Sequence, residues 1–124
     1  MIERHLDLIT PEGAMNTFVV HPEENGPHPV ILFFMDAPGK REELHEMARR
    51  LANTGYFVVL PNLYYRRTRE FELVRDEAGM ARMFELMNAL TNRLGVEDAA
   101  TLLRFCESEP AADARRIGAV GYCM

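Results

Sequence analysis

Residues able to do chemistry stand at three places along the chain, each directly after an apolar run. They are Asp36 with Ala37, the segment from Asn62 onward, and Cys123 with Met124. In open α/β sheets, reactive groups gather beyond the carboxyl ends of the strands. We therefore expect these three places to meet at one edge of a sheet.

Cys123 follows Gly121-Tyr122 in the pattern Gly-x-nucleophile-x of a nucleophile elbow, a strained turn that lifts the nucleophile above a sheet. Only the front of the motif can be checked, because Met124 is the last residue. Cys123 could also be a small buried residue at a strand end, since free cysteines are often buried. Its place after Gly121-Tyr122 favours the nucleophile.

A free thiol has a pKa of about 8.5, so it needs a neighbouring histidine to take its proton at neutral pH. The chain has four histidines, and we expect each to be a solvated surface side chain: His5, His21, His28 and His45. Cys106 continues a helical stripe four residues after Leu102, so we expect it to pack in the core.

Two sets of charged residues allow two interpretations each. Asp36 could belong to the site, or it could be a helix-start carboxylate that interacts favourably with the helix dipole. Arg66, Arg67, Arg69 and Arg75 could bind an anionic substrate, since guanidinium groups pair with carboxylates, or they could line a solvated loop. The methionine-rich stripe from Met80 to Met87 is most simply core, although it could line a pliable lid.

Alternating and continuous apolar runs predict the strands that must position these residues. The predicted strands are Ile2–Thr10, Ala14–Val20, Pro29–Met35, Tyr56–Leu60 and Arg116–Tyr122. The last three are apolar runs, and Arg116–Tyr122 is the third of these buried strands. Leu44, Met47, Ala48 and Leu51 form the stripe of an amphipathic helix over Arg41–Asn53. A longer helical pattern runs from Met80 to Cys106, with Gly95 interrupting it. This order of strands and crossover helices predicts an α/β fold.

The composition fits one soluble globular domain of 124 residues, with 48% hydrophobic and 27% charged residues. No apolar run is long enough to cross a bilayer, and the charged amino terminus shows no signal peptide. Two cysteines do not form a disulfide framework, so we expect a cytoplasmic protein. The net charge of −5 argues against nucleic acid or an anionic membrane as partner.

The chain resembles the dienelactone hydrolase family of α/β-hydrolases, whose members carry a cysteine nucleophile in a Gly-Tyr-Cys-x-Gly-Gly stretch. Three segments carry the resemblance, which covers nearly all of the residues. They are Gly118–Met124, Met35–Gly39 and Gly55–Tyr64.

The resemblance implies the amino-terminal part of a three-layer α/β-hydrolase sandwich. It also implies a Cys-His-Asp triad that hydrolyses small esters or lactones, like a carboxymethylenebutenolidase, without metal or organic cofactor. Cys123 is then the nucleophile, and the backbone N–H groups of Ala37 and Met124 form the oxyanion hole. Asp36 occupies the place of a glutamate that contacts the thiol in some members, and it is one methylene shorter.

In this family the triad aspartate and histidine follow the nucleophile, and no residue follows Met124 in the sequence. We therefore expect residues 1–124 to be an incomplete domain, truncated at the nucleophile elbow and inactive alone, whose strand 116–122 presents an unpaired edge. Two alternatives are a non-catalytic hydrolase-like binding or assembly module, and a serine-hydrolase relative whose cysteine is a redox sensor.

Overall fold

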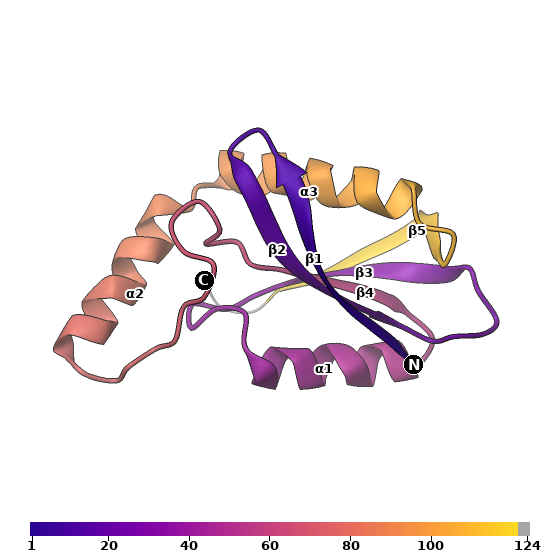
Figure 1. Cartoon of the computed structure of the whole chain (residues 1–124), viewed down its shortest axis with the longest axis horizontal. Coiled ribbons are helices and arrows are strands. Elements are labelled where there is room, and N and C mark those ends of the chain that lie inside the picture. The colour runs from indigo at the N-terminus through magenta and orange to yellow at the C-terminus, as the bar shows by residue number, and fades with distance from the viewer. Residues whose placement is uncertain (122–124) are drawn as a thin grey trace.

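The structure is a computed structural model, and it describes residues 1–121. Its central element is a five-stranded mixed sheet. Its strands lie in the order β1-β2-β4-β3-β5 (Figure 1). β1 (Ile2–Thr10) and β2 (Gly13–His21) form an antiparallel hairpin, and β2 also pairs antiparallel with β4 (Phe57–Pro61). β3 (His28–Phe34) runs parallel to both β4 and β5 (Ala112–Gly121). The α/β fold predicted from the sequence is confirmed.

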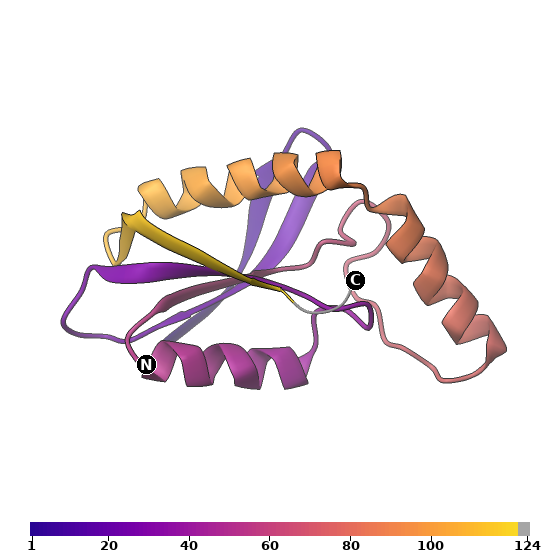
Figure 2. The same ribbon diagram turned by 180° about the vertical axis from the view of Figure 1, so that it is seen from behind.

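Helices cover both faces of the sheet, which gives three layers (Figures 1 and 2). α1 (Glu42–Asn53) packs on one face against Phe18, Phe33 and Leu60. α3 (Asn92–Glu107) packs on the other face. Because successive side chains of a strand point to opposite faces, a strand buried on both sides must be apolar throughout, and every residue of β4 is buried.

The core beneath α3 contains Leu102 and Cys106, both with no exposed surface. Their partners on the sheet are Val19 and Val59, which alternate with the residues facing α1. The prediction that Cys106 is a core residue is confirmed. Burial raises the pKa of its thiol to about 12, so the thiol is protonated and unreactive at neutral pH.

The long helical pattern is two helices, and the predicted interruption at Gly95 is wrong. α2 (Glu77–Ala89) ends before Leu90, and α3 begins after Thr91. The Thr91 side chain accepts a hydrogen bond of 3.2 Å from the Leu94 N–H, which satisfies one free donor of the new helix. Gly95 lies inside α3. In α2, Phe84 is 51% exposed, whereas Leu86 is buried.

The final strand differs from its prediction in start and burial. β5 begins at Ala112 rather than Arg116, and its residues 115–119 are exposed. Within the described residues β5 pairs with β3 alone, so it forms an edge of the sheet (Figure 2). The uncharged residues 117–119 are therefore exposed at this edge. Residue 122, the predicted end of this strand, is outside the described residues.

Candidate active site

The carboxyl ends of the parallel strands bring two of the three predicted places together. Asp36 and Ala37 follow β3, and Asn62 follows β4, its parallel neighbour. Phe34 at the end of β3 pairs with Gly121 at the end of β5. Cys123 and Met124, the predicted nucleophile and second oxyanion-hole donor, lie outside the described residues, so these roles stay predictions.

Ala37 lies in a tight turn over residues 36–39, which follows the carboxyl end of β3. The Gly39 N–H donates to the Asp36 carbonyl oxygen at 3.0 Å. Gly39 has a φ of 90°, a backbone conformation that disfavours residues with a Cβ. Within residues 1–121 no group accepts a hydrogen bond from the Ala37 N–H. A backbone donor at the sheet edge is what an oxyanion hole requires.

The Asp36 carboxylate is held by Arg41 in a bidentate ion pair. Arg41 Nη1 lies 2.5 Å from Asp36 Oδ1, and Arg41 Nη2 lies 3.1 Å from Asp36 Oδ2. Arg41 Nη1 also donates to the Gly39 carbonyl oxygen at 2.8 Å, so one guanidinium ties both ends of the turn. This hydrogen bonding to Asp36 raises the pKa of Arg41. The helix-start interpretation of Asp36 is wrong, because the N-cap of α1 is Arg41 itself and no side chain caps that end.

Tyr64 joins the turn from the segment after β4. Its hydroxyl donates to the Ala37 carbonyl oxygen at 2.8 Å, and the residue is 2% exposed. Burial, assisted by the Asp36 carboxylate, raises the pKa of Tyr64 to about 12, so its hydroxyl stays a donor at neutral pH. Neither Tyr64 nor Arg41 was singled out by sequence reasoning. Tyr64 lies in a segment that carries the family resemblance, which was the signal available.

Asn62 shapes the segment that carries Tyr64. It is 4% exposed, and its Nδ2 donates to the Thr68 carbonyl oxygen at 2.8 Å and to Asn16 Oδ1 at 2.9 Å. Its Oδ1 accepts from the Tyr64 N–H at 3.0 Å. Asn62 therefore acts as an internal brace and not as a reactive group.

Two of the four arginines after β4 form ion pairs with carboxylates of the chain, Arg66 a buried one and Arg69 an exposed one. Arg66 donates to both carboxylate oxygens of Asp98, each at 2.9 Å, and Asp98 is 1% exposed. Arg69 pairs with Asp7 of β1 at 2.8 Å. These two guanidinium groups are already engaged by carboxylates of the chain, which speaks against them as binders of an anionic substrate. Arg67 and Arg75 stay open.

The prediction of four solvated histidines is wrong for three of them. His21, His28 and His45 are all buried, because residues of other elements, such as Phe18 and Phe57, pack against them in the fold. His45 Nδ1 lies 3.0 Å from Glu42 Oε2, and His45 Nε2 lies 3.0 Å from Lys40 Nζ. Since the ammonium can only donate, Nε2 is the acceptor and the Nδ1–H faces Glu42. Burial lowers the pKa of His45.

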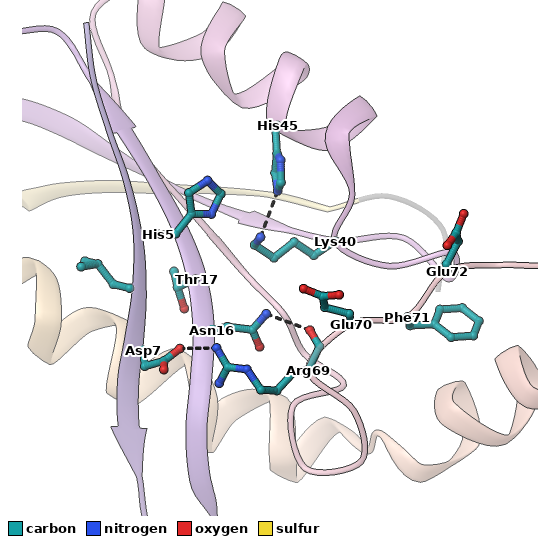
Figure 3. Close-up of a pocket in the computed structure, with 11 residues that line it drawn as sticks. His5, Asp7, Asn16, Thr17, Lys40, His45, Arg69, Glu70, Phe71 and Glu72 are labelled. Atoms are coloured by element: carbon teal, nitrogen blue, oxygen red, sulfur yellow. Dashed lines mark hydrogen bonds and ion pairs between the residues drawn. The ribbon is translucent and has the colours of Figure 1, made fainter.

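His45 and Lys40 border a polar pocket of about 710 Å³ beside the β1–β2 hairpin (Figure 3). Asp7 and Asn16 point into it from the hairpin, and Arg69 and Glu70 from the segment after β4. Acidic and basic groups face one another across this pocket. Sequence reasoning missed it, because its walls come from segments far apart in the chain.

A second, more apolar cleft of about 740 Å³ lies near the end of β3. Phe34 and Leu63 line one side of it, and the α2–α3 junction lines the other. Met87 of the methionine-rich stripe borders this cleft and also packs against the core.

Two further features bear on function. No group of three or more histidine, cysteine, aspartate or glutamate side chains in residues 1–121 is arranged to hold a metal ion. No helix in the same range is long and apolar enough to cross a membrane.

Comparison with known proteins now defines the class. The fold superposes on a Klebsiella pneumoniae crystal structure named "Putative Dienelactone Hydrolase" with a TM-score of 0.83 and 21% identity, over 98% of this chain and 50% of that one. A carboxymethylenebutenolidase of Pseudomonas putida is 26% identical over 125 residues, covering 100% of this chain and 52% of the relative. A "Putative carboxymethylenebutenolidase" of Methylorubrum extorquens is 28% identical over 112 residues, covering 90% and 38%.

These matches give the chain an α/β-hydrolase-like fold. The family model described as "Dienelactone hydrolase family" matches residues 15–124, and the chain belongs to that family. The chain spans about half or less of the length of the curated relatives it matches.

Proposed function

We propose that this chain contributes the nucleophile and the oxyanion hole of a hydrolase that cleaves small esters or lactones, as a carboxymethylenebutenolidase does. Cys123 is the nucleophile of a Cys-His-Asp triad whose histidine and aspartate lie outside these 124 residues. The chemistry uses no metal or organic cofactor, and the protein works in the cytoplasm. The observation that carries the proposal is the clamped turn after β3, which offers the Ala37 N–H at the carboxyl edge of the sheet.

The register between β3 and β5 supports the proposal that the Cys123 thiol lies near this turn. Phe34 and Gly121 are paired residues of adjacent parallel strands. Asp36 and Cys123 each follow their paired residue by two positions. Adjacent strands lie about 4.8 Å apart, so a nucleophile after β5 and a donor after β3 can reach the same carbonyl group.

The reaction then proceeds in two halves. The Cys123 sulfur attacks the ester carbonyl carbon while histidine takes the thiol proton, and the carbonyl oxygen becomes an oxyanion held by the N–H groups of Ala37 and Met124. The carbon–oxygen bond to the leaving alcohol breaks, and histidine returns the proton to that oxygen. Water then attacks the acyl-cysteine carbonyl, which releases the acid and restores the thiol.

We propose Asp36 as the acidic residue beside the thiol. Its carboxylate already accepts two hydrogen bonds from Arg41. The negative charge of Asp36 is therefore largely neutralised by Arg41. In this proposal the carboxylate lies beside the thiol and stays bound to Arg41.

The two cysteines allow an internally controlled test. In the intact protein at neutral pH, iodoacetamide should alkylate Cys123 and leave Cys106 unmodified, as measured by mass spectrometry of peptides, because Cys106 is buried and its thiol pKa is about 12. Cys123→Ala should lower p-nitrophenyl acetate hydrolysis by at least about 10³-fold.

Cys106→Ala is the matched control, and it should keep hydrolysis within about two-fold of the wild type once folding is verified by circular dichroism. Full hydrolysis by Cys123→Ala would contradict the proposal. It would favour a non-catalytic role for the thiol instead.

A further inference from the structure

We propose that Tyr64 is a positioning residue that aims the Ala37 N–H at the developing oxyanion, an inference that rests on the proposed function. The Tyr64 side chain itself touches neither substrate nor thiol in this proposal. It acts through the backbone of Ala37, which is flanked by two peptide planes, and each plane is held by a separate hydrogen bond.

The first plane joins Asp36 to Ala37. Its carbonyl oxygen accepts from the Gly39 N–H at 3.0 Å, inside the turn. The bond is trans, and the N–H of a trans peptide points opposite to its carbonyl. The Ala37 N–H therefore faces out of the turn, where no group of residues 1–121 accepts it.

The second plane joins Ala37 to Pro38 and carries no N–H, because proline lacks one. Its only hydrogen-bonding group is the Ala37 carbonyl oxygen, which accepts from the Tyr64 hydroxyl at 2.8 Å. Without that bond, the second plane could rotate about the Ala37 Cα–C bond. Such rotation would loosen the turn that directs the N–H of the first plane.

Tyr64 is itself rigidly held, as a positioning group must be. Its backbone N–H donates to Asn62 Oδ1 at 3.0 Å. Its ring packs edge-on against Phe71 with centroids 5.9 Å apart. The residue is 2% exposed, so little of its surface is open to water that would compete for the hydroxyl. Arg41 supports the same turn from the other side through Asp36 and Gly39.

Two reactions of the Cys123 thiol distinguish a loss of Ala37 N–H positioning from general damage to the site. Ester hydrolysis passes through an oxyanion, whereas alkylation by iodoacetamide does not. In the intact protein, Tyr64→Phe should lower kcat for p-nitrophenyl acetate about 10-fold, less than the loss of an oxyanion donor, and leave KM within about two-fold. The rate of Cys123 alkylation should stay within about two-fold of the wild type.

Tyr65→Phe is the matched control. It removes another buried tyrosine hydroxyl, one that bonds to Asp98 and Thr10 instead of the turn. It should leave kcat within about two-fold of the wild type. Both variants are compared under conditions where circular dichroism shows them folded.

The outcomes distinguish this inference from the proposed function. Unchanged hydrolysis in Tyr64→Phe, with Cys123→Ala inactive, would overturn the positioning role alone. A parallel loss of hydrolysis and alkylation would also overturn it, since that would be damage to the whole site. Full activity of Cys123→Ala would overturn the proposed function and this inference together.

Discussion

At the scale of single residues, the environment of a side chain decides its chemistry more than its type does. Cys106 is one of two cysteines, yet burial raises its thiol pKa to about 12 and leaves it inert. Tyr64 is kept protonated by burial and by a nearby carboxylate, so it serves as a hydrogen-bond donor. Burial lowers the pKa of His45, so its imidazole is neutral at neutral pH and takes up a proton only in more acidic solution.

His45 should make the protein less stable in mild acid. Burial lowers its pKa in the folded state below the value of about 6.5 expected in the unfolded chain, despite the opposing effect of the hydrogen bond that its Nδ1–H donates to Glu42. As pH falls through 6.5, the unfolded state therefore takes up the proton first, and the free energy of unfolding decreases until the folded-state pKa is reached. His5 and the Lys40 ammonium also face this ring and disfavour its charged form.

We expect the melting temperature of the wild type to fall between pH 7 and pH 5 by roughly 2–4 °C more than that of His45→Gln. Differential scanning calorimetry at the two pH values measures both shifts. Equal falls in the two proteins would show that His45 does not contribute to the pH dependence.

At the scale of elements, a few polar contacts fasten loops and helices to the sheet. Asp98 of α3 receives hydrogen bonds from Arg66 and from the Tyr65 hydroxyl at 2.9 Å. Tyr65 in turn bonds to Thr10 at the end of β1. One buried carboxylate thus connects the hairpin, the segment after β4 and α3.

Removing the Asp98 carboxylate should destabilise the fold strongly. Asp98→Ala leaves the Tyr65 hydroxyl without this acceptor and Arg66 with the exposed Glu12 as its remaining carboxylate partner, which should cost about 1–3 kcal/mol. Glu97→Ala, at the exposed neighbouring position, should cost less than about 0.5 kcal/mol. Urea unfolding followed by circular dichroism measures both free energies, and a similar cost for the two variants would contradict a central role for Asp98.

Two helical glycines should respond to alanine with opposite sign. A Cβ at Gly95 in α3 would meet no atom within 4 Å, so Gly95→Ala should stabilise by about 0.5–1 kcal/mol through its higher helix propensity. A Cβ at Gly79 in α2 would lie 1.8 Å from the Val74 carbonyl oxygen, so Gly79→Ala should destabilise by about 2 kcal/mol or more. Thermal unfolding of the two variants gives the signs, and a loss of stability in Gly95→Ala would show that the helix needs glycine there.

At the scale of the whole molecule, the exposed edge at β5 is the dominant feature. Its residues 115–119 are exposed, and Ile117 is 37% exposed. Unpaired N–H and C=O groups along such an edge act as a template for another strand. The arginines at 115 and 116 place charge on part of this edge, while Ile117 to Ala119 offer none.

Residues 1–124 alone should therefore self-associate. Analytical ultracentrifugation at micromolar concentration should show species larger than a monomer, and Ile117→Lys should increase the monomer fraction, because a charge on an edge strand opposes strand addition. A monodisperse wild-type monomer with a sharp two-state melt would count against this expectation.

Local patterns in the sequence were sufficient to predict the α/β class, the first four strands and α1, whereas β5 was predicted with the wrong start and the wrong burial. This is because alternation, apolar runs and helical periodicity reflect burial directly, as in β4 and in the stripe from Leu44 to Leu51. They also identified Asp36 and Ala37 as residues at the sheet edge. The division between α2 and α3 was misplaced, because a threonine cap outweighed the glycine inside the helical pattern.

What the chain by itself determined is thus the family, the order of elements and the residue types available for catalysis. Only the tertiary structure decided that Asp36 is bound to Arg41, that Tyr64 holds Ala37 and that three histidines are buried. The physical reason is range: hydrogen bonds and burial of this kind join side chains from different elements, such as Tyr64 and Ala37, which are 27 residues apart. No local periodicity records such contacts.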